Sequence, residues 1–357
     1  MIKKECFTAE WIEQVSSELH YNDKNLIEKV IRALSLLEML VKAGCPLVFK
    51  GGTALMLILG KSAHRLSIDI DLICPPGTNI EDYLKSFADF GFINLELVER
   101  KQRDDADIPK SHSKFFYQIA YRNDTDAQSY ILLDVLYEDI HYFRTQQIAI
   151  DCPFIRLEGK PLMVTVPSAE DILGDKLTAF APNTTGIPYY KNGRSCSMEI
   201  AKQLYDVGRL FENVSDLQIT KEAFREIAVV ELSYGSFGTD IGQVFNDIRQ
   251  TALCISTRGK AGEGDFDLIQ DGIIRVKSFM YKQRYLIDHA IIDAARAAYL
   301  ATLIEKGINE IESYSNNPAD IKDMVIRPSL PNKLNKLRSN LPEAYYYWAK
   351  TSELLEA

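Results

Sequence analysis

The stretch that decides the fold reads Phe49-Lys50-Gly51-Gly52-Thr53-Ala54-Leu55, and it is followed by Arg65-Leu66-Ser67-Ile68-Asp69-Ile70-Asp71-Leu72. A short apolar strand enters the glycine pair, and a helix is predicted to start there, where backbone N–H groups can hold an anion. Asp69 and Asp71 alternate along a predicted strand, so their carboxylates point to one face and can bind one cation. The stretch therefore predicts a site for a metal ion and a triphosphate.

The surrounding pattern predicts an α/β half followed by a helical half. A helix over residues 22–43 is indicated by apolar residues at helical spacing, by a capping Asn22 or Asp23 and by Gly44 at its end. Further on, the pattern predicts a helix over 79–90 and strands over 93–99, 114–121, 130–136 and 161–166. It predicts loops over 100–113 and 183–197, and residues typical of a turn at 122–126. After Pro167 helical patterns dominate, so we expect an α/β domain over 1–167 and a helical domain over 168–357.

Composition limits the class of protein. The 357 residues include no apolar run of the roughly 18 that a membrane span needs, and the N-terminus has no apolar signal-peptide core. We therefore expect a cytoplasmic protein with no membrane partner. Six scattered cysteines without a C-x-x-C pair indicate reduced thiols. The net charge of −9 argues against non-specific coating of nucleic acid, although it allows a local basic groove.

A third carboxylate interrupts an apolar run farther along. Asp134 lies within Ile131-Leu132-Leu133-Asp134-Val135-Leu136, where a charge is costly unless it is paired or bound to a metal ion. Asp69, Asp71 and Asp134 are therefore candidate ligands for Mg²⁺ or Mn²⁺. A solvated strand face for the first two, and a salt-bridged strand end for Asp134, are the alternatives.

The glycine pair also has two interpretations. Gly51 and Gly52 permit a tight turn at a strand–helix junction, or they let a phosphate approach the backbone closely. In the second case the Thr53 hydroxyl would be a further donor to the phosphate.

Two later motifs complete a pattern that resembles a known family. Asp175-Lys176-Leu177-Thr178-Ala179 is similar to a lysine motif, and Lys202-Gln203-Leu204-Tyr205-Asp206-Val207 is similar to Lys-Asp-Leu-Tyr-Asp-Leu. Together with the Gly-Gly-Thr helix start and Arg-x-Ser-x-Asp-x-Asp, these motifs closely resemble the AbiEii/AbiGii-type nucleotidyltransferase toxins of the polymerase-β-like superfamily. The resemblance covers about residues 45–210.

The resemblance implies an α+β fold, in which a mixed sheet with flanking helices precedes a mainly helical C-terminal domain. It implies that Asp69 and Asp71 bind the metal and that Ser67 lies beside them near the phosphates. Lys176 would contact the triphosphate, and Asp206 would complete the site from the helical half by orienting Lys176 or the substrate. Without the resemblance, a solvent-facing lysine and a surface aspartate are the simpler interpretations of the last two.

One residue of the second motif departs from the family pattern, and one basic and aromatic stretch lies outside it. Gln203 stands where the family often has an acid, so that position lacks a carboxylate. The stretch Pro328–Lys350 mixes lysines and arginine with Tyr345-Tyr346-Tyr347-Trp348. Basic and aromatic residues together can hold a nucleic-acid strand, but we favour a terminal helix that packs its aromatic side chains on the core.

The resemblance implies Mg²⁺-dependent transfer of a nucleotidyl group from a nucleoside triphosphate, with loss of pyrophosphate. In that family the acceptor can be the 3′ end of tRNA, which stops translation, and an antitoxin from the adjacent gene restrains the toxin. Two alternatives stay open. The acceptor could be a protein or a small molecule such as an aminoglycoside, which the acidic net charge favours. The chain could also be a non-catalytic nucleotide-binding module, against which the complete motifs argue.

Overall fold

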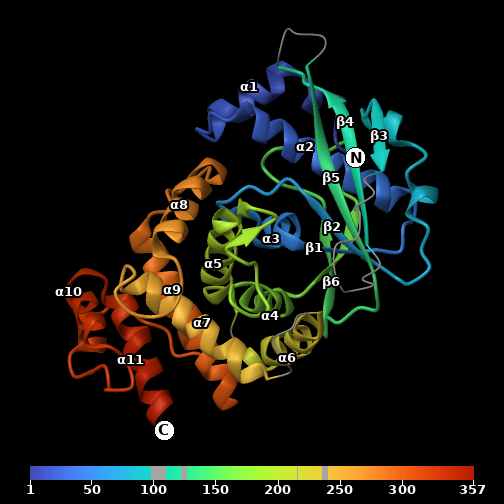
Figure 1. Ribbon diagram of the computed structural model, residues 1–357. Coiled ribbons are helices and arrows are strands. Elements are labelled where there is room, and N and C mark those ends of the chain that lie inside the picture. The colour runs from blue at the N-terminus through green and yellow to red at the C-terminus, as the bar shows by residue number, and fades with distance from the viewer. Residues whose placement is uncertain (98–109, 122–126, 215, 235–239) are drawn as a thin grey trace. The chain divides into compact units, whose positions relative to one another are not determined.

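The computed structural model describes residues 1–97, 110–121, 127–214, 216–234 and 240–357. The chain divides into two compact units (Figure 1). Unit 1 contains Met1–Ser168 and Ser278–Arg284, and unit 2 contains Ala169–Lys277 and Tyr285–Ala357. Each unit is described by itself.

A five-stranded mixed sheet is the centre of unit 1. Its strand order is β1-β2-β5-β4-β3, with β2 and β5 parallel and the other neighbours antiparallel. The strands are β1 (Val48–Lys50), β2 (Ile70–Cys74), β3 (Asn94–Leu97), β4 (Lys110–Gln118) and β5 (Gln128–Tyr137). Later in the sequence, the strands β6 (Thr145–Ala149) and β7 (Met163–Pro167) form a separate antiparallel sheet.

The two faces of the sheet differ in chemistry. Strand alternation places Phe115, Tyr117, Ile131 and Leu133 on one face, where all four side chains are buried. The long helix α2 (Lys24–Lys42) packs on this face and contacts β2 and β5 (Figure 1). The opposite face, which we call the outer face, carries the alternate residues of the same strands: Lys50, Asp71, His112, Lys114, Phe116, Tyr130, Leu132 and Asp134.

Helix α2 begins and ends where the sequence predicts. The Asp23 carboxylate accepts a hydrogen bond from the Leu26 N–H at 3.1 Å, and Gly44 follows the helix in the left-handed conformation at φ 76°. Two shorter elements complete this side of unit 1: the 3₁₀ turn η1 (Lys4–Phe7) and helix α1 (Ala9–Glu18).

The segment 79–90 does not form the predicted helix. It forms two 3₁₀ turns, η3 (Ile80–Tyr83) and η4 (Phe87–Phe90). The Ser35 hydroxyl of α2 donates to the Phe90 carbonyl at 3.1 Å, and the Arg32 guanidinium donates to the Gly91 carbonyl at 3.1 Å. The helix prediction is wrong because these tertiary bonds to α2 outweigh local propensity.

Other strand predictions are confirmed with shifted ends. The hairpin of β4 and β5 and the strand β7 lie where the pattern predicts them. Residues 110–113, predicted as loop, belong to β4, and the rest of that loop and the 122–126 turn lie outside the described residues. Strand β2 begins at Ile70, so Asp69 of the predicted strand lies just before it. The chain at Arg65 and Leu66 pairs with Met280 and Phe279.

The segment Ser278–Arg284 belongs to unit 1, although it follows residues 169–277 of unit 2 in the sequence. The Tyr281 N–H donates to the His64 carbonyl at 3.0 Å, and its hydroxyl donates to the Ala63 carbonyl. The Tyr281 ring packs edge-on against Phe154 at 5.2 Å between centroids. The segment therefore closes the core of unit 1 next to Arg65.

Unit 2 is mainly helical. Its helices are α4 (Ala169–Ala179), α5 (Ser197–Phe211), α6 (Leu217–Tyr234), α7 (Ile241–Ser256), α8 (Phe266–Val276), α9 (Ile287–Lys306), α10 (Leu337–Asn340) and α11 (Pro342–Glu356). The 183–197 segment, predicted as loop, contains the small hairpin β8 (Tyr190–Lys191) and β9 (Arg194–Ser195).

Close approach of α5 and α9 depends on a glycine. A Cβ on Gly208 would lie 2.0 Å from Asp293 Oδ1, so only glycine leaves room for this buried carboxylate. Asp293 accepts hydrogen bonds from Tyr285 at 3.0 Å and from Arg209 and Arg296 at 3.5 and 3.4 Å. The mixed sheet of unit 1 and the helices of unit 2 confirm the predicted α+β fold class.

Candidate nucleotidyl-transfer site

Two of the three predicted metal ligands lie side by side on the outer face. Asp71 of β2 and Asp134 of β5 are partners in the parallel ladder, so their Cα atoms are about 4.8 Å apart and their side chains share a face. Both side chains are half-buried. Asp69 precedes β2 by one residue and is exposed.

A histidine that the sequence analysis did not select contacts Asp134. His112 is the antiparallel partner of Asp134 on β4, and its Nδ1 is hydrogen-bonded to Asp134 Oδ1. The His112 side chain is only 11% exposed. The five histidines have no metal-ligand spacing, so only the register of the hairpin could have identified this one.

The two glycines leave room for the side chains of the predicted site. Gly51 has φ 78°, and a Cβ there would lie 2.2 Å from Asp71 Oδ2. A Cβ on Gly52 would lie 2.7 Å from Ser67 Oγ and 3.0 Å from an Arg65 guanidinium nitrogen. The start of helix α3 (Gly51–Leu59) therefore lies directly against Asp71, Ser67 and Arg65.

Thr53 fixes the chain on which Asp69 lies. Its side chain is fully buried, and its hydroxyl donates to the Asp69 carbonyl at 2.7 Å. This bond connects the first turn of α3 to the residue that precedes β2. A direct contact between the Thr53 hydroxyl and a phosphate stays a prediction.

The residues of this face fit a magnesium ion. Carboxylate oxygens are the ligands that Mg²⁺ prefers, and proteins often hold it by one or two carboxylates together with water and substrate phosphates. Asp71 and Asp134 supply such a pair, and the missing Cβ of Gly51 leaves space at the Asp71 carboxylate. Within the described ranges, no group of three or more His, Cys, Asp or Glu side chains is arranged to hold a metal ion by itself. Phosphate and water oxygens would therefore complete the coordination.

The two predicted residues of unit 2 form a buried pair. Lys176 Nζ of α4 lies 3.3 Å from Asp206 Oδ2 of α5 and donates to Gln203 Oε1 at 2.9 Å. The two charged side chains are only 9% and 2% exposed. They are not solvated surface residues, which was the simpler interpretation of the sequence. Gln203, at the position where the family often has an acid, is a neutral partner of the lysine.

The basic and aromatic stretch at the C-terminus belongs to the core of unit 2. Tyr345, Tyr346, Tyr347 and Trp348 of α11 are buried, as expected for a packing helix. Two cations of the stretch, Lys333 and Lys336, line a separate cavity of about 440 Å³ together with Arg258 and Lys260.

Comparisons with known proteins identify the family to which the chain belongs. The outer face brings two carboxylates together beside a glycine-rich helix start, which is a donor set for a metal ion and a phosphate. The model of the family described as nucleotidyl transferase AbiEii toxin, type IV toxin–antitoxin system, matches residues 34–275, well over half of the chain. The protein therefore belongs to the AbiEii nucleotidyl transferase toxins and is a nucleotidyltransferase.

Solved structures give only loose similarity. JHP933 from Helicobacter pylori is 15% identical with a TM-score of 0.40, over 86% of this chain and 95% of that chain. A nucleotidyltransferase toxin from Mycobacterium tuberculosis, MenT4, is also 15% identical, with a TM-score of 0.39 over 82% of this chain and 89% of that chain. No curated protein matches the chain.

Three further findings concern the cysteines, membrane spans, and the substrate and partner. All six cysteines are outside disulfides, as expected. In the described part of the chain no helix is long and apolar enough to cross a membrane. The family membership implies a nucleoside triphosphate as substrate and a cognate antitoxin as partner.

Proposed function

We propose that the protein transfers a nucleotidyl group from a nucleoside triphosphate to an RNA acceptor such as the 3′ end of tRNA, with Mg²⁺ or Mn²⁺. The observation that carries the proposal is the register of Asp71 with Asp134 beside the Gly51 helix start. An RNA acceptor is supported by the resemblance to toxins that block translation.

The outer face would supply the groups that the reaction needs. The acceptor hydroxyl oxygen forms a bond to the α-phosphorus, and the bond from that phosphorus to the pyrophosphate oxygen breaks. Pyrophosphate leaves with the electron pair, and the hydroxyl proton passes to a carboxylate of the face. Asp71 and Asp134 would hold Mg²⁺, which neutralises phosphate charge when it is bound. Asp69, one residue before β2, is proposed as a further carboxylate for the metal. The backbone N–H groups at Gly51 and Gly52 would hold phosphate oxygens.

Lys176 is the proposed cationic contact to the triphosphate. An ammonium group is a compact charge on a long stem, well suited to phosphate. Asp206 and Gln203 hold that ammonium group in one place, so we propose that both act by positioning Lys176. The helical part of the chain, with an expected boundary near residue 167, would thereby contribute to the same reaction.

The experiment is to incubate the purified protein with each α-labelled nucleoside triphosphate and separated tRNA, protein and small-molecule fractions. We expect label on tRNA in the presence of Mg²⁺ and none with excess EDTA. Asp71→Asn should remove transfer because it keeps the size of the side chain but loses the charge. Label only on protein or on a small molecule would instead establish the second candidate, which the net charge of −9 favours.

The biological part of the proposal concerns the antitoxin. We propose a cytoplasmic toxin whose cognate antitoxin is encoded by the adjacent gene. Expression of the wild type should arrest growth, Asp71→Asn should not, and co-expression of the neighbouring gene should restore growth. Equal arrest by both variants would show that transfer is not the cause of toxicity.

A further inference from the structure

The outer face continues away from the carboxylates along the β4–β5 ladder. Three successive pairs on this face are His112 with Asp134, Lys114 with Leu132, and Phe116 with Tyr130. Tyr130 lies four positions before Asp134, which corresponds to about 13 Å along the strand. The proposed reaction centre and the aromatic pair therefore lie on one surface, with a cation between them.

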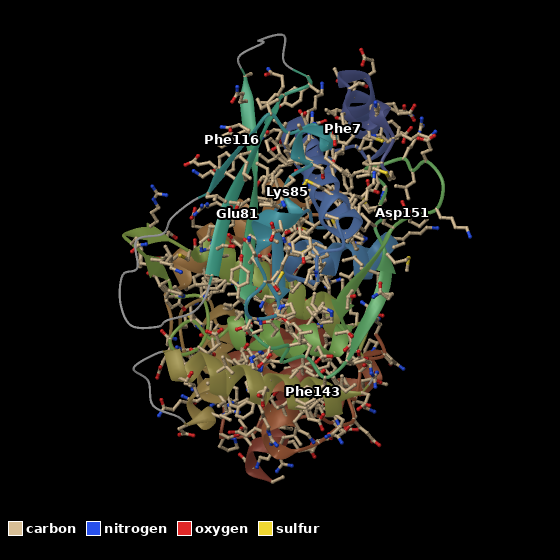
Figure 2. All side chains as sticks on the ribbon, turned by 90° about the vertical axis from the view of Figure 1, so that its right-hand side faces the viewer. Phe7, Glu81, Lys85, Phe116, Phe143 and Asp151 are labelled. Carbon is tan, nitrogen blue, oxygen red and sulfur yellow. The ribbon has the colours of Figure 1, made fainter. Side chains whose placement is uncertain are left out.

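The aromatic pair is not fully used in packing. The rings of Phe116 and Tyr130 lie 5.7 Å apart between centroids, at an angle of 54°. Tyr130 is nevertheless 43% exposed, and Phe116 is half-buried. Figure 2 labels Phe116 on this ladder. The pair stabilises the hairpin and at the same time presents an accessible aromatic ring on the outer face.

Cations accompany the exposed ring. Lys114 Nζ lies 5.4 Å and Lys29 Nζ 5.7 Å from the centroid of Tyr130. Lys114 also lies 3.8 Å from Glu96, a pair in which the carboxylate side chain is 52% exposed. Such an exposed pair contributes little stability, so a phosphate can replace the carboxylate at low cost.

Aromatic rings with neighbouring cations match the chemistry of an unpaired nucleic-acid strand. Bases stack on aromatic side chains regardless of sequence, while lysines contact the backbone phosphates. A double helix hides its bases from such contacts, and RNA is commonly bound through single-stranded ends and loops. A net charge of −9 makes a local site of this kind more necessary, because the remaining surface repels RNA.

We propose that the outer face of the β4–β5 ladder docks the single-stranded end of the acceptor RNA. Its bases stack on Phe116 and Tyr130, a backbone phosphate contacts Lys114, and its terminal hydroxyl reaches the carboxylate at Asp134. This inference rests on the proposed RNA acceptor, which it supplies with a binding surface.

The test compares Tyr130→Ala, Tyr130→Leu and Tyr130→Phe in the full-length protein. Tyr130→Ala and Tyr130→Leu should each raise the KM for tRNA about tenfold or more, because loss of one base–aromatic stack weakens binding by that order. Tyr130→Phe keeps the ring and should behave as wild type. The KM for the nucleoside triphosphate should not change in any of the three, which also reports that unit 1 is intact.

A matched control lies on the opposite face of the same sheet. Leu97 of β3 pairs with Ser113 and is 49% exposed, so Leu97→Ala removes an exposed apolar side chain without touching the outer face. It should leave both KM values unchanged. Lys114→Gln should lower the slope of log affinity against log salt by about one, as expected for one lost phosphate contact.

A measurement of RNA binding tests the docking surface independently of the proposed transfer reaction. Fluorescence anisotropy of a labelled single-stranded RNA, without any nucleoside triphosphate, tests the surface even if the wild type transfers nothing to RNA. Weaker binding by Tyr130→Ala than by wild type and Leu97→Ala supports the surface. Equal binding by all three, or no RNA binding by the wild type, overturns it. Absence of label on tRNA with intact RNA binding would overturn only the proposed acceptor.

Discussion

At the residue scale, Gly51 is the most sensitive position of the site. Its φ of 78° makes alanine unfavourable, and an added Cβ would lie 2.2 Å from Asp71 Oδ2. Gly51→Ala should therefore displace the Asp71 carboxylate and reduce transfer by at least about 100-fold, comparable to losing a group that stabilises the transition state. The measurement is the initial rate of nucleotidyl transfer.

Gly44 provides the control for backbone strain alone. It has φ 76°, but nothing lies within 4 Å of its added Cβ. Gly44→Ala should destabilise the protein by about 1 kcal/mol, as alanine does at positive φ, and leave transfer unchanged. If Gly44→Ala loses activity to the same extent, general strain rather than contact with Asp71 explains the effect.

The buried pair of Lys176 and Asp206 requires care in mutagenesis. Removing one partner leaves an uncompensated buried charge, which costs about 3–5 kcal/mol. Lys176→Met should therefore lower stability strongly as well as abolish transfer. The double variant Lys176→Met with Asp206→Leu should recover most of the stability but no activity. Urea unfolding measures the first effect and the transfer rate the second, and recovery of transfer by the double variant would contradict the role of Lys176.

Individual site residues differ in how well the sequence reveals them. Asp71 can be selected from its alternation with Asp69 beside the glycine pair, and Asp134 because a charge in an apolar run is costly. The structure makes the two ladder partners. His112 cannot be selected, because its neighbour Asp134 is known only once the hairpin register is known. The burial of Lys176 likewise depends on how α4 packs on α5. Short-range sequence patterns carry no information on this helix packing.

At the scale of elements, the packing of α5 on α9 predicts a pH dependence. Burial raises the pKa of the Asp293 carboxyl to about 6, although Arg209 and Arg296 lower it. In the unfolded chain an aspartate ionises near its ordinary pKa of about 4. Between about pH 4 and pH 6 the folded protein holds more protons than the unfolded chain, so its stability falls as pH rises through this window.

The corresponding variant is Asp293→Asn, which cannot ionise. It should remove a pH-dependent contribution of at most about 3 kcal/mol, the value of a shift of about two pKa units. Urea unfolding of wild type and variant at several pH values between 4 and 7 measures the difference. Parallel stability curves across this range would show that Asp293 does not titrate there.

Elements are predictable where local signals agree with packing. Helix α2 has a capping aspartate, helical apolar spacing and a terminal glycine, and all three are used in the structure. Residues 79–90 have apolar spacing without equally strong ends, and hydrogen bonds from Ser35 and Arg32 of α2 decide their conformation instead. The chain before β2 likewise depends on distant residues, since Arg65 and Leu66 pair with Met280 and Phe279.

At the scale of the whole molecule, the segment Ser278–Arg284 should be essential for the stability of unit 1. Tyr281 is buried, packs on Phe154 and donates to the Ala63 carbonyl. Tyr281→Ala should cost about 3–5 kcal/mol, as large aromatic deletions from cores do. Lys282→Ala is the control, because this neighbouring side chain is exposed, donates to the Lys61 carbonyl and lies 5.2 Å from the centroid of the Tyr281 ring, so its removal leaves that ring in the core. Equal urea midpoints for the two variants would contradict a structural role for the segment.

This return of the chain also affects how the protein is made. A ribosome synthesises residues 169–277 before it reaches Ser278, so the core beside Arg65 and Ala63 stays open until about four-fifths of the polypeptide exists. Nascent domains usually fold from the N-terminus onward, but here every strand of the sheet that carries Asp71 and Asp134 is synthesised long before the segment that closes the core beside it. A chain that ends before Ser278 would have every strand of this sheet but no closing segment, so we expect such an incomplete product to be unstable.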